Sequence, residues 1–262
     1  MDDVALLTPR QARQRFRQGL KTPTAGWCKG YVQTNLLIVP KEFAYDALLF
    51  AQRNPRSCPV LEVTDEGDPR PLRFAPDADL RTDLPAYRVY ENGVRVAETT
   101  SIVDLWRDDF VSFLVGCSFT FEAALLDAGI PLKHISLGLN VAMYRTNIRC
   151  RPAGRLQGPM VVSMRPIPAE LVARAVEVSA RFPHSHGAPI HIGEPEKIGI
   201  RDLAKPDFGD PVPIAPGELP VFWACGVTFE AAVAASRPPL AITHSPGHMF
   251  ISDVKDSATT FF

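Results

Sequence analysis

Two stretches of the chain share one pattern of hydrophobic and polar residues, which predicts the same local structure twice. Residues 110–125 read FVSFLVGCSFTFEAAL, and residues 221–233 read VFWACGVTFEAAV. Each begins with an apolar run of strand length, passes through a glycine and a cysteine, and continues with an acid-led helical pattern, which favours a strand, a tight turn and a helix. A threonine oxygen can accept from a free backbone N–H group, so we expect Thr120 and Thr228 to be the N-caps of the two helices.

The similarity extends beyond these stretches. Residues 36–43 resemble residues 164–171, and residues 52–60 resemble residues 180–190. The matched blocks occur in the same order in the chain, which indicates an internal duplication. We therefore predict an α/β fold, internally duplicated, with two pseudo-equivalent α/β halves and mixed sheets.

The duplication also suggests domain boundaries. We expect an N-terminal helix and lead-in at 1–26, a first α/β half at 27–153 and a second α/β half at 154–262. An alternative is two interleaved discontinuous domains, one made of the β-α-β units of both halves and the other of the two strand-turn-helix stretches.

Local signals predict the remaining elements. Thr8 followed by Pro9 indicates the start of a helix. Asn92-Gly93 indicates a type I′ turn in a hairpin near 86–98, which has no counterpart in the second half. Residues 64–85 are rich in Asp, Pro and Arg and are expected to form a surface connection or an active-site loop. Further strands are expected at 31–39, 59–63, 160–164, 189–192, 221–224 and 241–244, and further helices at about 40–52, 169–181 and 228–236.

Composition narrows the class of protein. The formal net charge of −1 over 262 residues gives no global field that favours nucleic acid or an anionic membrane. No apolar run approaches the roughly 18 residues of a membrane span, and the N-terminus carries no apolar signal core. Five cysteines without close pairs argue against a disulfide framework. We expect a cytoplasmic protein with reduced thiols.

The repeated stretches are candidate anion sites, because backbone N–H groups at a helix start can bind a carboxylate or phosphate. Glu122 and Glu230 lie where the helix dipole favours negative charge, so each is either a dipole partner or a functional acid. Cys117 and Cys225 end the two strands, where a thiol is either a nucleophile of lowered pKa or a small buried residue.

The histidines and the missing motifs limit the chemistry further. Pro246 and Gly247 separate His244 from His248 and exclude the helix that a zinc motif of this spacing needs. We expect no metal and no cofactor, and either histidine is a candidate acid or base near neutral pH. GxGxxG, P-loop and GxSxG patterns are absent from the sequence, which lowers the expectation of nucleotide or common hydrolase chemistry.

Several longer blocks together resemble one known family. They are QTNLLIVP (33–40), NPRSCPVLEV (54–63), RTDLP (81–85), VGCSFTFE (115–122), MYRTN (143–147), VVSMRP (161–166), HGAPIHIG (186–193), WACGVT (223–228) and ITHSPGHMF (242–250). The sequence resembles the hydro-lyase family that includes D-glutamate cyclase, from about Thr22 to Asp253. The resemblance implies a carbon–oxygen lyase, and its characterised branch closes D-glutamate to 5-oxo-D-proline with loss of water.

A mechanism for that reaction is a hypothesis built on these residues. Ring closure needs a base for the ammonium proton, an acid for the departing oxygen and N–H donors around the oxyanion. Glu122 with His248, or with His244, is the expected acid–base pair, and a cysteine acyl intermediate on Cys117 is a less favoured variant. Residues expected to bind or orient the substrate are Asn35, Thr120, Arg145, Arg165, Cys225, Thr228 and Glu230.

Two further functions stay open. A thiol-dependent hydrolase or amidase would use Cys117 or Cys225, and a non-catalytic protein would bind a carboxylate metabolite between the halves. The expected partner is a small carboxylate, without nucleic acid or membrane, and a homo-oligomer is one option.

Overall fold

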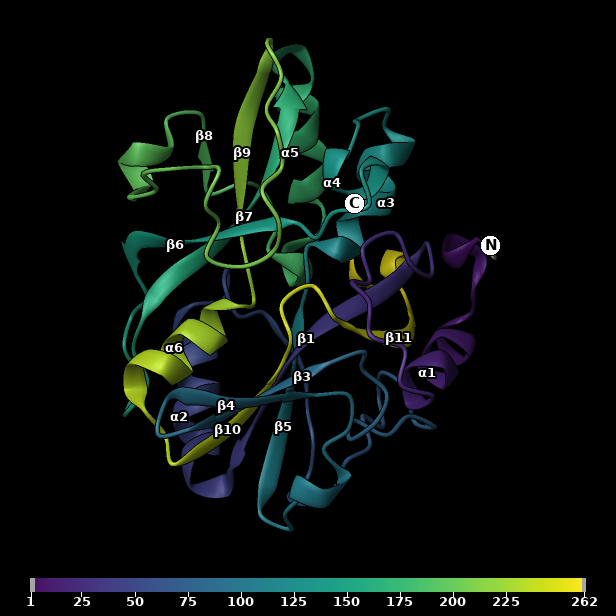
Figure 1. The fold of residues 1–262 in the computed structure, drawn as a ribbon, viewed down its shortest axis with the longest axis vertical. Helices are drawn as coiled ribbons and strands as arrows, with labels where there is room; N and C mark the ends of the chain where they lie inside the picture. The colour runs from purple at the N-terminus through teal and green to yellow at the C-terminus, as the bar shows by residue number, and fades with distance from the viewer. Residues whose placement is uncertain (1–2, 261–262) are drawn as a thin grey trace.

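The computed structural model describes residues 3–260, which form two β-sheets with helices packed around them (Figure 1). The larger sheet has the strand order β2-β5-β1-β10-β3-β4, with β11 also paired to β1, and the smaller sheet has the order β6-β7-β9-β8. The strands are β1 (Tyr31–Pro40), β2 (Val60–Val63), β3 (Tyr87–Glu91), β4 (Val94–Thr99), β5 (Phe110–Gly116), β6 (Ala142–Arg149), β7 (Pro159–Pro168), β8 (His191–Ile192), β9 (Glu218–Ala224), β10 (Leu240–His244) and β11 (Phe250–Lys255). The α-helices are α1 (Pro9–Arg17), α2 (Lys41–Arg53), α3 (Phe119–Asp127), α4 (Lys133–Ser136), α5 (Val172–Ala180) and α6 (Thr228–Ser236).

The fold is α/β with duplicated halves, but the expectation of mixed sheets is wrong. Every strand pair with an assigned register in residues 3–260 is antiparallel. The reason lies in the β-α-β units. In β1-α2-β2, strand β5 lies between the two parallel strands, and β9 separates β7 from β8 in the same way.

The register of the strands reproduces the duplication residue by residue. Adding 128 to the residue numbers of β1 and 108 to those of β5 converts all seven β1–β5 pairs into the seven β7–β9 pairs. Thr34 opposite Gly116, for example, becomes Val162 opposite Ala224. Because a slip by one residue would turn every side chain to the other face, the shared register means that equivalent side chains point the same way in both halves.

The two halves exchange a strand. β6 follows the first strand-turn-helix stretch but pairs with β7, whereas β11 follows the second stretch and pairs with β1. Tyr144 of β6 faces Val162, and Phe250 of β11 faces the equivalent Thr34. The sheets therefore divide the chain differently from the boundaries 27–153 and 154–262, which stay a prediction about the sequence repeat.

Local signals explain the clearest elements. Thr8 and Gln11 form a capping box at the start of α1, with Pro9 in the first turn. Asn92 and Gly93 have φ angles of 50° and 77° between β3 and β4, as a type I′ turn requires.

Hydrophobic side chains cover both faces of each sheet. In the larger sheet, Phe50 of α2 and Phe229 of α6 pack on one face, and Leu114 of β5 belongs to the core of the other. In the smaller sheet, Phe121 of α3 packs with Trp223 of β9, and Phe222 faces the opposite side. A further apolar cluster joins Cys117, Cys225 and Phe208, so the two strand-turn-helix stretches share one core.

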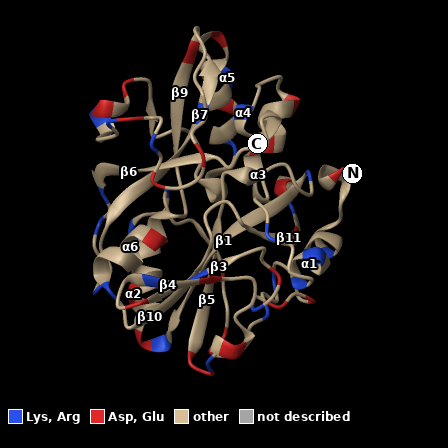
Figure 2. Ribbon diagram, viewed as in Figure 1, with Lys and Arg blue, Asp and Glu red and all other residues tan. Residues whose placement is uncertain are grey.

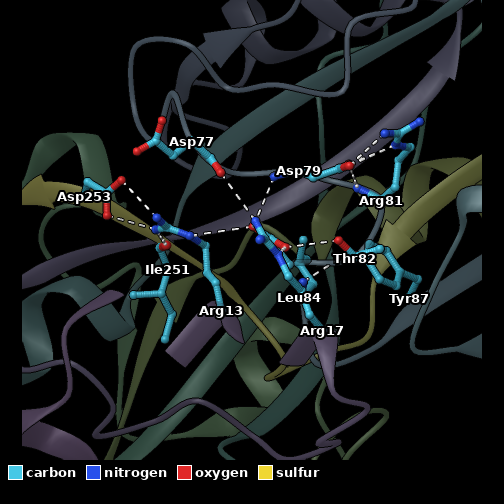
Figure 3. Close-up of polar contacts among 11 residues, drawn as sticks. Arg13, Arg17, Asp77, Asp79, Arg81, Thr82, Leu84, Tyr87, Ile251 and Asp253 are labelled. Carbon is cyan, nitrogen blue, oxygen red and sulfur yellow. Dashed lines mark hydrogen bonds and ion pairs between the residues drawn. The ribbon is translucent and has the colours of Figure 1, made fainter. Parts of the chain in front are cut away.

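Residues 64–85 are held by a buried ion-pair network (Figure 3). Asp83 is fully buried, its Oδ2 lies 3.7 Å from Arg13 Nε, and Arg17 Nη2 donates to the same oxygen at 2.7 Å. Arg13 also pairs with Asp253 of β11 at 3.0 Å. Since a buried charge needs partners, this network fixes α1 and the long connection against β11.

In the described part of the chain, no helix is long and apolar enough to cross a bilayer. Lys and Arg segments are interspersed with Asp and Glu segments over the ribbon in the view of Figure 2.

Candidate functional site

Thr120 and Thr228 take equivalent places but are not N-caps, so that expectation is wrong. α3 already begins at Phe119 and α6 at Thr228 itself. Thr120 Oγ1 accepts from Gln33 N of β1 at 3.1 Å, and Thr228 Oγ1 accepts from Val161 N of β7 at 3.0 Å. The preceding residues, Ser118 and Val227, adopt helical angles, so the helices start early and each threonine ties its helix to a strand.

Glu122 is the centre of the first polar cluster, here named the Glu122 cluster (Ser118, Glu122, His134, Ser163 and Arg165). Its Oε1 accepts from Arg165 Nε at 3.0 Å and Nη2 at 2.5 Å, and His134 Nε2 lies 2.9 Å away. Burial raises the pKa of Glu122, but His134 and Arg165 outweigh burial, so the net pKa lies below its ordinary value. The remaining guanidinium contacts go to Ser163 and Ser118, at 3.1 and 2.9 Å.

The second polar cluster, here named the Arg88 cluster (Arg88, Glu98, Glu230, His244, Ser245 and His248), includes the equivalent glutamate. Arg88 Nη1 lies 2.8 Å from Glu230 Oε1, and Arg88 Nε lies 3.1 Å from Glu98 Oε2. Arg88 comes from β3 and Glu98 from β4, so the hairpin brings a cation to the start of α6. Ser245 Oγ also lies within 3.3 Å of Glu98 Oε2.

The two carboxyl groups on Arg88 are shifted in opposite directions. Burial raises the pKa of Glu230 above its ordinary value, because Arg88 offsets only part of the cost of burying charge. Burial also acts on Glu98, but its ion pairs with Lys21 and Arg88 dominate and lower the pKa of Glu98 to about 2. One arginine therefore contacts a carboxyl whose pKa is raised and a carboxyl whose pKa is lowered.

The histidines of this cluster lie where β10 and β11 separate beside β1. β10 pairs with Leu37 and β11 with Thr34, and residues 244–249 leave the sheet between these two points. His244 Nδ1 lies 3.2 Å from Leu36 N and 3.4 Å from Leu36 O. The shorter contact makes Nδ1 the acceptor, so Nε2 carries the proton, and this buried Nε2 has no hydrogen-bond partner.

His248 has the opposite tautomer. Its Nδ1 lies 3.1 Å from Pro246 O, which can only accept, so Nδ1 carries the proton and Nε2 presents a lone pair. Burial lowers the pKa of both histidines, to about 3 for His244. Near pH 7 the loop thus offers one N–H donor, His244, and one base, His248.

Asn35 and the two cysteines lie where the repeated turns meet. Asn35 Nδ2 donates to Gly116 O at 2.7 Å, and a Cβ on Gly226 would come within 2.2 Å of the Asn35 side chain. Cys117 and Cys225 are both buried, and burial raises the pKa of each thiol, to about 11 for Cys225. Protonated thiols give no support to thiolate chemistry here.

Arg145 has an ion pair of its own but lies close enough to Glu230 for its charge to act against the raised pKa of that carboxyl. It pairs with Asp207 at 3.1 Å, and its guanidinium carbon lies 4.8 Å from the centre of the Phe208 ring. Arg88 approaches the same ring at 5.9 Å, so both arginines contact Phe208.

Comparisons with known proteins show the family to which the chain belongs. The D-glutamate cyclase family model matches residues 111–253, which is more than half of the chain. A relative from Saccharopolyspora erythraea is 62% identical over 96% of this chain and 98% of its own, and one from Nocardioides is 60% identical over 98% and 94%. Both relatives carry the name "Putative hydro-lyase". The chain belongs to the D-glutamate cyclase family.

A solved structure of a nitrogen repressor-like protein from Methanococcus jannaschii overlaps with 89% of this D-glutamate cyclase family chain and 91% of its own, with a TM-score of 0.40 and 11% identity. A TM-score this low carries no argument about function.

The family match contains all the residues expected from the sequence except Asn35, and the structure places five of them in the two clusters. Glu122 and Arg165 lie together, and His244 and His248 lie near Arg88, which also pairs with Glu230. Sequence reasoning missed Arg88, Glu98 and His134. Arg88 and Glu98 precede the matched range and lie on a hairpin that reads as an ornament, so no local signal marks them.

Among residues 3–260, no group of three or more His, Cys, Asp or Glu side chains is arranged to hold a metal ion.

Proposed function

We propose that this protein closes D-glutamate to 5-oxo-D-proline with loss of water, and that the Arg88 cluster is the active site. The observation that carries the proposal is the pair of carboxyl groups on Arg88 with oppositely shifted pKa values. Enzymes that run acid and base chemistry at one pH depend on such differences between neighbouring groups. Family membership supports the reaction class.

In the proposed reaction the substrate nitrogen attacks the distal carboxyl carbon. A C–N bond forms, a C–O bond breaks, and the ammonium loses two protons, which leave with the oxygen as water. His248 Nε2 takes the first proton, and protonated Glu230 gives a proton to the departing oxygen. His248 then passes its proton to the same oxygen, which leaves as water, and the second proton of the nitrogen moves to Glu230, so both residues return to their starting states.

Two donors in the cluster suit the carboxylates of the substrate. His244 Nε2–H is buried without a partner, and Arg88 is already the shared cation. Both would stabilise the negative charge that grows on the reacting carboxyl oxygen. We assign the acid to Glu230 rather than Glu122, because Glu122 is ionised and held by Arg165 and His134.

Proton NMR of the purified protein with D-glutamate, in the presence and absence of EDTA, tests the proposal. New 5-oxoproline resonances are expected, and Glu230→Gln is expected to lower kcat by about 100-fold or more, the usual range for a lost acid or base. Glu91→Gln, on the hairpin that carries Arg88, is the matched control and should retain activity. Unchanged turnover in folded Glu230→Gln would refute the assignment, and a lack of product from the native protein would refute the substrate.

A further inference from the structure

A cavity of about 160 Å³ lies beside the Glu122 cluster, between residues 26–31, the beginning of β1 and α3. Its walls include Trp27, Tyr31, Phe119 and Ile135, which are apolar or aromatic. Gln33 and Glu122 also line it. The residues of the Arg88 cluster are absent from this lining, so the cavity is separate from the proposed active site.

Both polar residues named above have a buried acceptor without a hydrogen-bond partner. Gln33 Nε2 donates to Thr24 O at 3.0 Å and to Trp27 O at 3.2 Å, which fixes the orientation of the amide and leaves Oε1 unpaired. Glu122 Oε1 is occupied by Arg165 and His134, whereas Oε2 is unpaired. Buried polar groups normally have partners, so two unsatisfied acceptors at one cavity call for an explanation.

The charges restrict what can supply the missing donors. Lys29 also lines the cavity, but it is half exposed and paired with Asp127, so the buried charge at the cavity is Glu122. A bound anion would face the ionised Glu122, and a bound cation would add a second buried positive charge near Arg165. A neutral N–H group avoids both costs. The volume corresponds to about five water molecules at roughly 30 Å³ each, enough for a single ring.

We infer that this cavity is a binding site for a small neutral amide or lactam, with its N–H groups on Gln33 Oε1 and Glu122 Oε2 and its apolar body against Trp27 and Phe119. The inference does not depend on the proposed function. Its ligand lacks the charges that the Arg88 cluster is proposed to recognise.

Four probes that share one aromatic ring distinguish neutral, anionic and cationic ligands: benzamide, benzoate, benzylamine and methyl benzoate. Each is titrated against the full-length protein and followed by ligand-observed NMR. Benzamide is expected to bind most tightly, because it alone is neutral and carries N–H donors. Equal binding of all four probes, or binding of none, would overturn the inference and leave the cavity to water.

Two variants locate the binding. Gln33→Met keeps the length of the side chain but removes the acceptor, and should weaken benzamide binding about 5-fold, the value of one neutral hydrogen bond. Ala123→Leu fills the cavity from α3 and should abolish binding, whereas Ala124→Leu, the next residue on the helix and outside the lining, should not. Thermal unfolding confirms that each variant is folded. Benzamide binding that survives both lining variants would refute this site.

Discussion

At the scale of single residues, the duplication copies a glutamate but not its environment. Glu122 and Glu230 occupy the same position in the repeated stretch, and both are buried. Glu122 meets Arg165 and His134, and its pKa falls, whereas Glu230 shares Arg88 with Glu98, and its pKa rises. Ionisation therefore depends on side chains that come from outside the repeated stretch.

Because His244 is buried, we expect the folded protein to lose stability in acid. Its folded-state pKa of about 3 lies below the unfolded value of 6.5, so the unfolded chain binds more protons between these values and the folded state loses stability as pH falls through that window. The free energy of unfolding, measured with urea, should be lower at pH 5 than at pH 7.5. This difference should be about 2 kcal/mol smaller in His244→Asn, whose side-chain oxygen can still accept from Leu36 N. His191→Asn, at a partly exposed position, is the control. An identical loss in the native protein and His244→Asn would contradict the burial argument.

At the scale of elements, the glycine of each repeated turn marks a close approach of the other half. A Cβ on Gly116 would lie 1.7 Å from His184 O, and a Cβ on Gly226 would lie 2.2 Å from the Asn35 side chain. The first neighbour is backbone and the second is a side chain. Because only the second neighbour can be removed by substitution, mutations can test the two close approaches independently.

We expect Gly226→Ala to destabilise the protein by about 1–3 kcal/mol through overpacking. The same change should cost at least about 1 kcal/mol less in an Asn35→Ala background, because the clashing side chain is gone. Gly116→Ala is the matched control and should not be rescued by Asn35→Ala. A double-mutant cycle from urea unfolding measures both couplings, and additive effects of Gly226→Ala and Asn35→Ala would argue against the contact.

At the scale of the whole molecule, the exchanged strands make the halves depend on each other. β1 pairs with β10 and β11 from the end of the chain, and β7 pairs with β6 from the first half. Arg165 of β7 also neutralises Glu122 of α3. A cut between the repeats therefore leaves unpaired strands and a buried charge in both pieces.

Separate fragments 1–153 and 154–262 are expected to be unfolded alone and to regain the native fold when mixed. Circular dichroism and cooperative urea unfolding of each fragment and of the equimolar mixture measure this, with the uncut chain as the reference. A monomeric fragment that unfolds cooperatively by itself would show that the exchanged strands are dispensable.

The sequence by itself determined the elements that depend on neighbours along the chain. The capping box at Thr8, the type I′ turn at Asn92-Gly93 and the repeated strand-turn-helix pattern follow from local chemistry and hydrophobic pattern. Family membership also follows from blocks legible in the sequence.

Only the tertiary structure decided which distant groups meet. Nothing near Arg88 in the sequence indicates Glu230, 142 residues away, and nothing near Glu122 indicates Arg165. The threonines look like caps, but strands β1 and β7 approach closely enough to take their hydroxyl groups. Local pattern fixes each element and the face it buries, whereas the pairing of elements, and with it the charge around each glutamate, depends on packing across the whole chain.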